Sequence, residues 1–178
     1  IAEKYQIPVI LLSDQYLGDA SSTVEPFDPE RIHVSEPTAE IETEGEYLRY
    51  RYSESGISPR LIPGKTSQPV LIDSDEHDER GWITESAEVR TQMMDKRMRK
   101  IDGLKQELLE PDFIGSDHFD TLLLGWGSAW GPIAQAVQLL NEDRQGQYAA
   151  LVFGDIYPLP QKLLTEKASK AKRIINVE

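Results

Sequence analysis

Short apolar runs recur along the chain and predict strands of two parallel sheets, of which the run at residues 7–12 belongs to a sheet whose other strands are expected outside this sequence or in another chain. The runs carry few polar interruptions, as strands covered on both faces do, and they fall at residues 7–12, 121–124, 149–153 and 173–177. Helical spacing follows the second and third runs, at residues 129–141 and 158–170, and Ser128 is the expected cap of the first of these helices. Strand and helix alternating at this pitch indicate an α/β fold with right-handed crossovers.

The longest helical pattern covers residues 84–110. Its apolar stripe recurs at spacings of three and four residues and comprises Val89, Met93, Met94, Met98, Ile101, Leu104 and Leu108. Thr84 or Ser86 is placed to cap the helix, and Pro111 ends it. We expect the stripe to pack in the chain's own core; an adaptable, methionine-rich partner surface is the alternative.

The region between the first apolar run and this helix predicts an ordered connector. Residues 21–82 are acidic and rich in proline. Alternating stretches at residues 39–42 and 47–52 indicate short antiparallel strands. A flexible linker would contain more Gly and Ser and fewer aromatic residues.

Composition narrows the range of functions. A net charge of −12 over 178 residues disfavours nucleic acid and anionic membrane surfaces as partners. The chain has no Cys, so it forms no disulfide, offers no thiolate to a metal and has no Cys nucleophile. No apolar run approaches the roughly 20 residues that cross a bilayer.

The glycine-rich turn after the second apolar run is a candidate nucleotide site. Gly125, Gly127 and Gly131 lie between a strand and a helix, where glycines let a backbone approach a pyrophosphate, and Asp155 follows the next strand. The spacing departs from G-x-G-x-x-G, and Trp126 and Trp130 occupy the turn. We therefore favour a tight turn whose tryptophans pack on a neighbouring domain.

Two further clusters have a structural and a functional interpretation. The acidic run at residues 73–79, with His77 inside it, either binds a hard cation or forms a salt-bridged loop, which we favour. His33 and His118 lie in loops without a serine-nucleophile pattern.

Arginines surround the second alternating stretch. Arg49, Arg51 and Arg60 could bind a carboxylate or the phosphates of a coenzyme. Pairing across strands with acids of the same region is the favoured alternative; those acids are Glu40, Glu42, Glu44 and Glu46.

In series, the motifs of this chain resemble the alpha subunit of 2-oxoacid:ferredoxin oxidoreductases, the 2-oxoglutarate enzymes above all. They occur in family order over nearly the whole chain. They are residues 2–5 with 8–15, 56–60 with 63–64, 75–79 with Gly81, 93–100, 125–128, 155–160 and 174–178.

The resemblance implies an organisation and an activity. Residues 1–20 are similar to the end of a thiamine-pyrimidine domain, residues 21–115 to the interdomain connector, and residues 116–178 to a truncated transketolase-C-terminal-like domain. The chain is then a piece of a cytoplasmic enzyme subunit, inactive alone, whose family oxidatively decarboxylates a 2-oxoacid to an acyl-coenzyme A. Thiamine diphosphate, Mg²⁺ and iron–sulfur clusters are expected in the whole complex and not on this piece. The expected partners are the beta subunit, gamma or delta subunits or domains, and ferredoxin.

The resemblance also suggests roles for individual residues. No catalytic residue and no metal ligand is expected here. Ser55, Gly56, Ser58 and Arg60 are expected close to the substrate or to coenzyme A, and Trp126 and Trp130 at an interface. Ser55 departs from the acid that often precedes this motif in the family, which leaves the identity of the oxoacid open.

Overall fold

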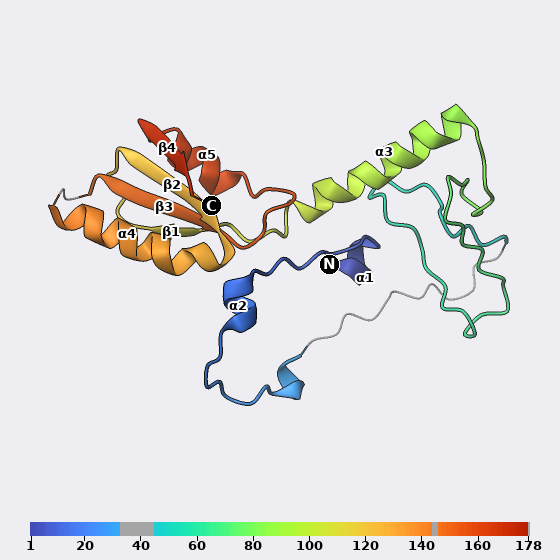
Figure 1. The fold of residues 1–178 in the computed structure, drawn as a ribbon. Coiled ribbons are helices and arrows are strands. Elements are labelled where there is room, and N and C mark those ends of the chain that lie inside the picture. Colours follow the sequence, from blue (N-terminus) through green and yellow to red (C-terminus); the bar gives the residue numbers. More distant parts are fainter. Residues whose placement is uncertain (33–44, 144–145, 178) are drawn as a thin grey trace. The chain divides into compact units, whose positions relative to one another are not determined.

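The computed structural model describes residues 1–32, 45–143 and 146–177. Contacts divide the chain into two units, and each unit is discontinuous in sequence (Figure 1). Unit 1 consists of Ile1–Ile10 and Glu25–Gln106, and unit 2 of Leu11–Val24 and Glu107–Glu178. The expected strand at residues 39–42, together with His33, Glu40, Glu42 and Glu44, lies outside the described residues.

Unit 2 is an α/β domain built on a four-stranded sheet in the order β1-β3-β2-β4. The strands are β1 (Asp112–Ile114), β2 (Thr121–Trp126), β3 (Tyr148–Phe153) and β4 (Arg173–Asn176). β2 pairs in parallel with β3 and with β4, which confirms the α/β fold expected from the sequence. β1 was not predicted; it pairs antiparallel with β3 and forms one edge.

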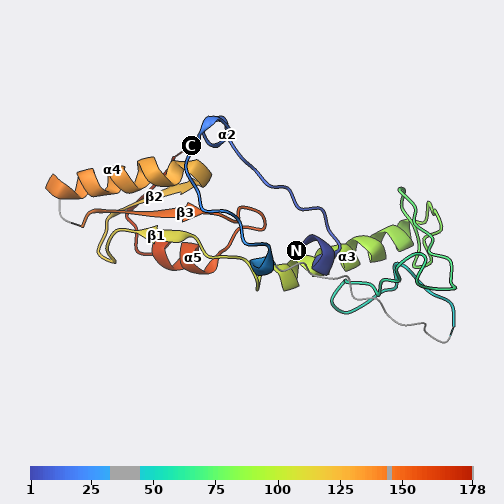
Figure 2. The ribbon, with the colours of Figure 1, turned by 90° about the horizontal axis from the view of Figure 1, so that it is seen from below.

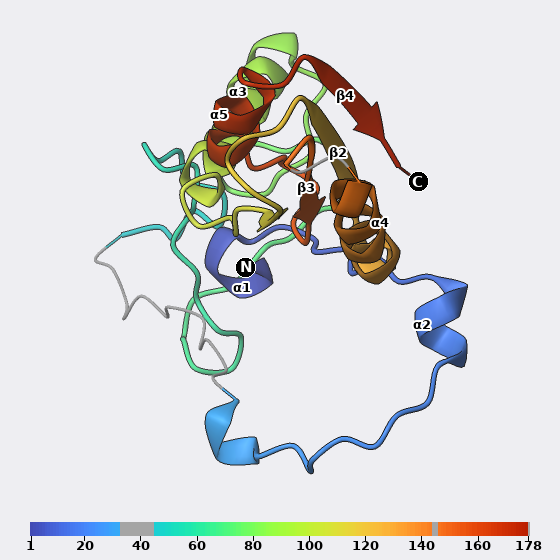
Figure 3. The same ribbon diagram turned by 90° about the vertical axis from the view of Figure 1, so that its left-hand side faces the viewer.

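Two helices cover opposite faces of this sheet, as Figures 2 and 3 show. α4 (Trp130–Asp143) packs over a cluster that includes Ile133, Val137 and Ala150. On the other face, α5 (Lys162–Ala168) contributes Leu163 and Leu164. Both helices therefore bury one apolar face against strands that are themselves apolar on both faces.

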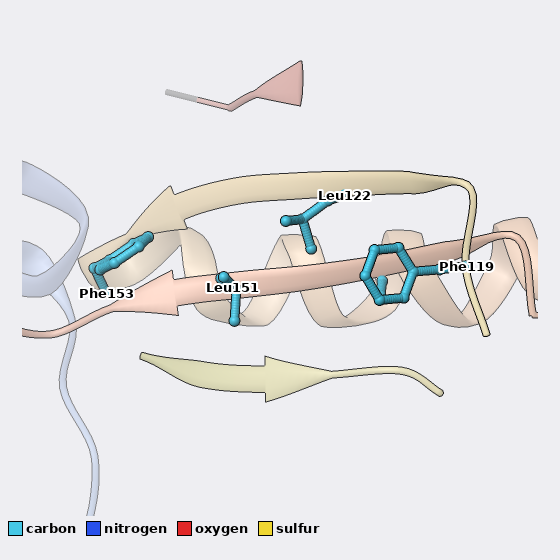
Figure 4. Packing of buried hydrophobic residues seen from close by; sticks show 5 residues of the cluster. Phe119, Leu122, Leu151 and Phe153 are labelled. Carbon is cyan, nitrogen blue, oxygen red and sulfur yellow. The ribbon is translucent and has the colours of Figure 1, made fainter. Parts of the chain in front are cut away.

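The cluster on the α5 face is one of the two buried cores of unit 2. Phe119, Leu122, Leu151 and Phe153 lie along β2 and β3 and around the turn that precedes β2 (Figure 4). Leu122 and Leu151 are fully buried. Burial of such side chains stabilises a fold by about 1.5–3 kcal/mol each, so these strands form the rigid centre of the unit.

Unit 1 is organised around one long helix, α3 (Ala87–Leu104). Ser86 caps it by accepting a hydrogen bond from the amide of Val89 at 3.4 Å, which confirms one of the two predicted caps. The helix ends before the predicted boundary at residue 110, just after Gly103. Its methionine stripe is only partly core, because Met93 is buried while Met98 is exposed.

Several predicted elements are wrong in the structure. Residues 7–12 form no strand, and the side chains of Ile10 and Leu11 are exposed. Residues 47–52 form a turn and irregular chain, because their tyrosines point to different partners rather than to one sheet face. Ser128 does not cap α4; it lies in the 3₁₀ turn η2 (Gly127–Ala129) that precedes the helix.

The remaining short helices belong to the N-terminal segments. α1 (Ala2–Tyr5) lies in unit 1, and Tyr5 is its buried residue. α2 (Gln15–Asp19) lies in unit 2 and is capped by Asp14. A 3₁₀ turn, η1 (Pro29–Arg31), follows in unit 1.

Candidate functional site

The four residues singled out near the substrate lie on one ordered segment of unit 1, the 55–60 loop (residues 55–60). Gly56 is its contact with α3: its φ is +79°, and a Cβ there would meet the carbonyl oxygen of Lys96 at 2.2 Å. Positive φ is costly for residues other than glycine. The backbone of the loop therefore rests directly on the helix, and only glycine fits at this point.

Ser58 and Tyr47 fix the middle of the loop. Ser58 is buried, and its hydroxyl donates to the carbonyl oxygen of Arg51 at 2.9 Å. The Tyr47 hydroxyl donates to the carbonyl oxygen of Pro59 and accepts from the amide of Leu61, both at 3.0 Å. Because these bonds are buried or half-buried, they define one loop conformation.

Ser55 and Arg60 are the accessible members of the set. The Ser55 hydroxyl accepts a hydrogen bond from the amide of Ile57 at 3.3 Å, and its side chain is exposed. The Arg60 guanidinium pairs with Glu3, and about a third of its side chain is exposed. The loop thus offers a hydroxyl and a guanidinium to solvent, while Gly56 and Ser58 have structural contacts.

The cations of α3 hold backbone carbonyl groups of unit 1, which the sequence did not predict. Lys96 Nζ donates to the carbonyl oxygen of Tyr50 at 2.9 Å. The Arg99 guanidinium donates to that of Ser53 at 3.2 Å. Lys96 and Arg99 are three residues apart and share a helix face. Together they fasten the chain immediately before the 55–60 loop.

Gln6 links the start of the chain to the same loop. Its backbone is left-handed, with φ at 51°. Its Nε2 donates to the carbonyl oxygen of Ser58 at 2.7 Å. Its Oε1 accepts from Arg49 and its carbonyl oxygen from Lys100 Nζ, both at 3.0 Å. A single glutamine therefore connects α1, the 55–60 loop and α3, all within unit 1.

The acidic run at residues 73–79 is a salt-bridged and hydrogen-bonded loop. Glu76 pairs with Arg90 and Arg97, and the Arg97 hydrogen bond is the main reason that its pKa lies below its ordinary value. The Asp78 carboxylate accepts from the amides of residues 80–82. Among the described residues, no cluster of His, Asp and Glu is arranged to hold a metal ion. The favoured structural interpretation of this run agrees with these contacts.

The turn at residues 125–131 lies at the carboxyl end of β2. Trp126 and Trp130 are 38% and 46% exposed, and the Trp130 indole donates to Asp112 Oδ2 at 3.0 Å. The Ser128 hydroxyl donates to the Asp14 carboxylate, which is the first cause of the lowered pKa of Asp14. Carboxylates therefore occupy the approach to the start of α4.

Asp155, the candidate ribose ligand, is also engaged. Its Oδ2 accepts from the amide of Leu109 at 2.8 Å. A phosphate approaching the 125–131 turn would meet the negative charges of Asp14 and Asp112, which repel it. The geometry of unit 2 therefore disfavours the nucleotide site.

Two remaining points concern His118 and membrane-spanning helices. His118 is exposed in irregular chain before β2, where its carbonyl oxygen accepts from the Ser116 hydroxyl. No helix of the described residues is long and apolar enough to cross a membrane.

Comparison with known proteins places the chain among particular relatives. No protein-family model matches it. All of the chain aligns with the alpha subunit of 2-oxoacid:ferredoxin oxidoreductase 1 of Sulfurisphaera tokodaii, at 31% identity over 183 residues. The chain is a homologue of these alpha subunits. The alpha subunit of 2-oxoacid:ferredoxin oxidoreductase 2 of Aeropyrum pernix is likewise 31% identical, over 99% of the chain.

More distant relatives are named for 2-oxoglutarate. The 2-oxoglutarate synthase subunit KorA of Methanocaldococcus jannaschii is 27% identical over 98% of the chain. The chain spans 28% of the length of the two alpha subunits and 45% of that of the synthase subunit. It therefore corresponds to part of each of these homologous subunits.

A solved structure shares the fold. The 2-oxoglutarate:ferredoxin oxidoreductase of Magnetococcus marinus, with 2-oxoglutarate, coenzyme A and succinyl-CoA bound, matches with a TM-score of 0.73 at 23% identity. The match covers 84% of this chain and 26% of that one. At this identity, the likeness establishes the fold alone.

Proposed function

We propose that this chain is part of the alpha subunit of a 2-oxoacid:ferredoxin oxidoreductase, which oxidatively decarboxylates a 2-oxoacid to an acyl-coenzyme A. The observation that carries the proposal is the alignment of 99–100% of this chain, at 31% identity, with 28% of the length of alpha subunits of that name. The relatives named 2-oxoglutarate synthase, and the fold shared with a 2-oxoglutarate enzyme, favour 2-oxoglutarate as the oxoacid.

In this proposal the cofactors are bound elsewhere in the complex. The chain has no Cys, so it supplies no thiolate to an iron–sulfur cluster. Thiamine diphosphate with Mg²⁺ would require a site that accepts a diphosphate, whereas the 125–131 turn is approached by Asp14 and Asp112. The residues of this turn do not fit that group. The 125–131 turn is therefore not the site of the thiamine diphosphate, and we assign the cofactors to other parts of the enzyme and the electron transfer to ferredoxin.

The contribution of this chain is structure, an interface and one binding loop. The 55–60 loop carries Ser55 at one end and Arg60, which pairs with Glu3, at the other, and a guanidinium is the preferred partner of a carboxylate or phosphate. Trp126 and Trp130 are large, exposed aromatic side chains, which are enriched at the centres of protein interfaces. We assign the loop to the oxoacid or coenzyme A and the tryptophans to a neighbouring domain or subunit, with the beta subunit as the expected partner.

The Arg60 assignment is tested in the assembled enzyme. Arg60→Ala should raise the KM for 2-oxoglutarate or for coenzyme A about tenfold or more, because a charge-assisted hydrogen bond is lost. Arg80→Ala is the matched control, since Arg80 is an exposed arginine that pairs with Glu46. Unchanged KM values for both substrates in Arg60→Ala would refute the role of the loop. A wild-type complex that oxidises no 2-oxoacid would refute the proposed function itself.

The alternative function is a nucleotide- or coenzyme A-binding module that uses the 125–131 turn. Titration with NADH or coenzyme A, followed through the fluorescence of Trp126 and Trp130, distinguishes the two. The contacts of Asp14, Asp112 and Asp155 lead us to expect no response.

A further inference from the structure

Three cationic side chains of unit 1 converge on two residues. Arg49 Nη1 and Lys100 Nζ each lie 3.0 Å from an oxygen of Gln6, the side-chain Oε1 and the backbone carbonyl respectively. Lys96 Nζ lies 2.9 Å from the carbonyl oxygen of Tyr50. The Tyr50 ring also lies under the Arg49 guanidinium, at 5.0 Å, and under Lys96 Nζ, at 5.8 Å. We call Arg49, Lys96 and Lys100 the cation cluster.

No carboxylate among the described residues pairs with the cation cluster. Within the described residues, their side chains donate to neutral oxygens, either a backbone carbonyl or the Gln6 amide. The nearby acids are already engaged: Glu76 pairs with Arg90 and Arg97, and Glu79 accepts from the amide of Tyr52. The charge of Glu79 raises the pKa of Lys96 and so partly offsets the cluster, but no carboxylate of the described residues forms an ion pair with its three cations.

The charges act on one another. Burial first, and then the positive charges of Lys100 and Arg49, lower the pKa of Lys96 to about 8. Burial and the charge of Arg49 also lower the pKa of Lys100. Bringing like charges together disfavours the charged forms unless an anion enters the site.

The cluster also has unused hydrogen-bond donors. A guanidinium carries five N–H groups and an ammonium carries three; Arg49 and Lys100 each use one on Gln6. Arg49 and Lys100 are half-buried and so are not closed off from solvent, whereas Lys96 is 4% exposed and acts through its charge. The group that fits is an oxyanion with several oxygens and two charges.

We propose that Arg49, Lys96 and Lys100 form an anion site beside the 55–60 loop that binds a phosphate-type dianion. A single carboxylate would leave two of the three charges uncompensated, whereas a phosphate or diphosphate group offers more charge and more acceptors. Gln6 orients both exposed donors and, through Ser58, connects the site to the loop. This site is independent of the 125–131 turn, and its binding does not depend on the proposed oxidoreductase activity.

The test measures binding rather than turnover. Inorganic pyrophosphate is titrated into the full-length protein by calorimetry at low salt, with the double variant Arg49→Gln, Lys100→Gln for comparison. Both glutamines keep an N–H donor for Gln6 and remove the charge. The control is Arg80→Gln, Lys105→Gln, a double variant of exposed cations that lie outside the cluster.

The expected result is an increase of about tenfold or more in the Kd of the cluster variant, with the control close to wild type. Equal affinity in wild type and cluster variant would overturn the proposal, as would the absence of binding to wild type or an equal loss in the control. Should the double variant lose its fold by circular dichroism, Lys100→Gln alone is titrated, with the same expected direction and Lys105→Gln as control.

A second titration, with coenzyme A, identifies the source of the phosphate. Weaker binding of coenzyme A to the cluster variant means that the site takes phosphates carried by a larger ligand. Pyrophosphate binding that coenzyme A does not reproduce means that the site takes a free inorganic anion. Both results support the site, and both are obtained without measuring the oxidoreductase reaction.

Discussion

The side-chain amide of Gln6 donates to the carbonyl oxygen of Ser58 at 2.7 Å, across 52 residues of sequence. Gln6 adopts a left-handed backbone conformation that residues other than glycine rarely adopt. The hydrogen bonds of its amide and carbonyl groups offset this cost, and the candidate binding loop is thereby connected to the first turn of the chain.

Gln6→Glu tests this connection. The carboxylate cannot donate to the Ser58 carbonyl oxygen, and two acceptors then face each other, whereas pairing with Arg49 is retained. We expect faster amide hydrogen exchange at residues 56, 57 and 61. Gln92→Glu, which changes an exposed glutamine on α3, should leave exchange in the loop unchanged. Equal protection in the two variants would show that Gln6 does not hold the loop.

Gly56→Ala should destabilise unit 1 more than a change at another glycine of the same conformation. The new Cβ meets the Lys96 carbonyl oxygen at 2.2 Å, so the cost of the positive φ, roughly 1–2 kcal/mol, is joined by an overpacking cost of about 1–3 kcal/mol. Gly64→Ala is the control, because its φ is +83° and nothing lies within 4 Å of the new atom. Denaturant unfolding measures both. The prediction is wrong should the two losses be the same.

Lys96 should make the protein more stable as pH rises from about 8 toward 10.5. In the folded state its pKa is about 8, chiefly through burial, and the unfolded value is 10.5. The unfolded state therefore binds more protons in this window, and the free energy of unfolding increases by roughly 2–3 kcal/mol across it.

Lys96→Met removes this increase. The variant loses the hydrogen bond to Tyr50 at every pH, so the comparison is one of slopes and not of absolute stabilities. Lys105→Met, at an exposed position, should keep the wild-type slope. A wild-type slope in Lys96→Met would show that another group titrates in this window.

Glu76 should contribute stability that disappears in acid. Its pKa lies below its ordinary value of 4.5, first because Arg97 donates a hydrogen bond to it. The contribution is present above pH 4.5 and is lost as pH falls through the lowered pKa. Glu76→Gln should lower the free energy of unfolding by about 1–3 kcal/mol at pH 7. It should also reduce the fall in stability between pH 7 and pH 3, which we call the acid limb.

Asp75→Asn is the control for Glu76. Asp75 is an exposed neighbour in the same acidic run. Urea unfolding between pH 3 and 7 should leave its acid limb like that of the wild type. An unaltered acid limb in Glu76→Gln would instead assign the loss of stability to other carboxylates.

The sequence predicted the elements whose signals are local. The strands and helices of unit 2 follow apolar periodicity, and Ser86 could be recognised as a cap because capping depends on residues within one turn. β1 has three residues, too few to show a period, and its edge position follows from pairing with β3. The tyrosines at residues 47–52 led to the wrong prediction of a strand, because alternation alone does not distinguish side chains on one sheet face from side chains that make separate long-range contacts.

The candidate site was predicted only in part. The motif located Ser55, Gly56, Ser58 and Arg60 on one segment, but spacing gave no indication of which of them would be buried. Arg49 was recognised as a possible anion ligand, but Lys96 and Lys100 were not joined to it, because they lie on a helix far along the sequence and the charges of α3 looked like an ordinary solvated face. Whether the loop contacts a substrate stays a prediction.

The discontinuity of the two units has a consequence for biosynthesis. Lys100 contacts Gln6 across 94 residues, and the Leu11–Val24 segment of unit 2 lies between the two parts of unit 1. During translation, α1 is synthesised long before α3, so the contacts between them in unit 1 can form only after α3 has been made. In unit 2, the Asp14 carboxylate likewise gains its contact only once Ser128 has been synthesised. The entropy cost of closing these long loops is therefore met late, because neither unit can form its closing contacts until the more C-terminal segment has been synthesised.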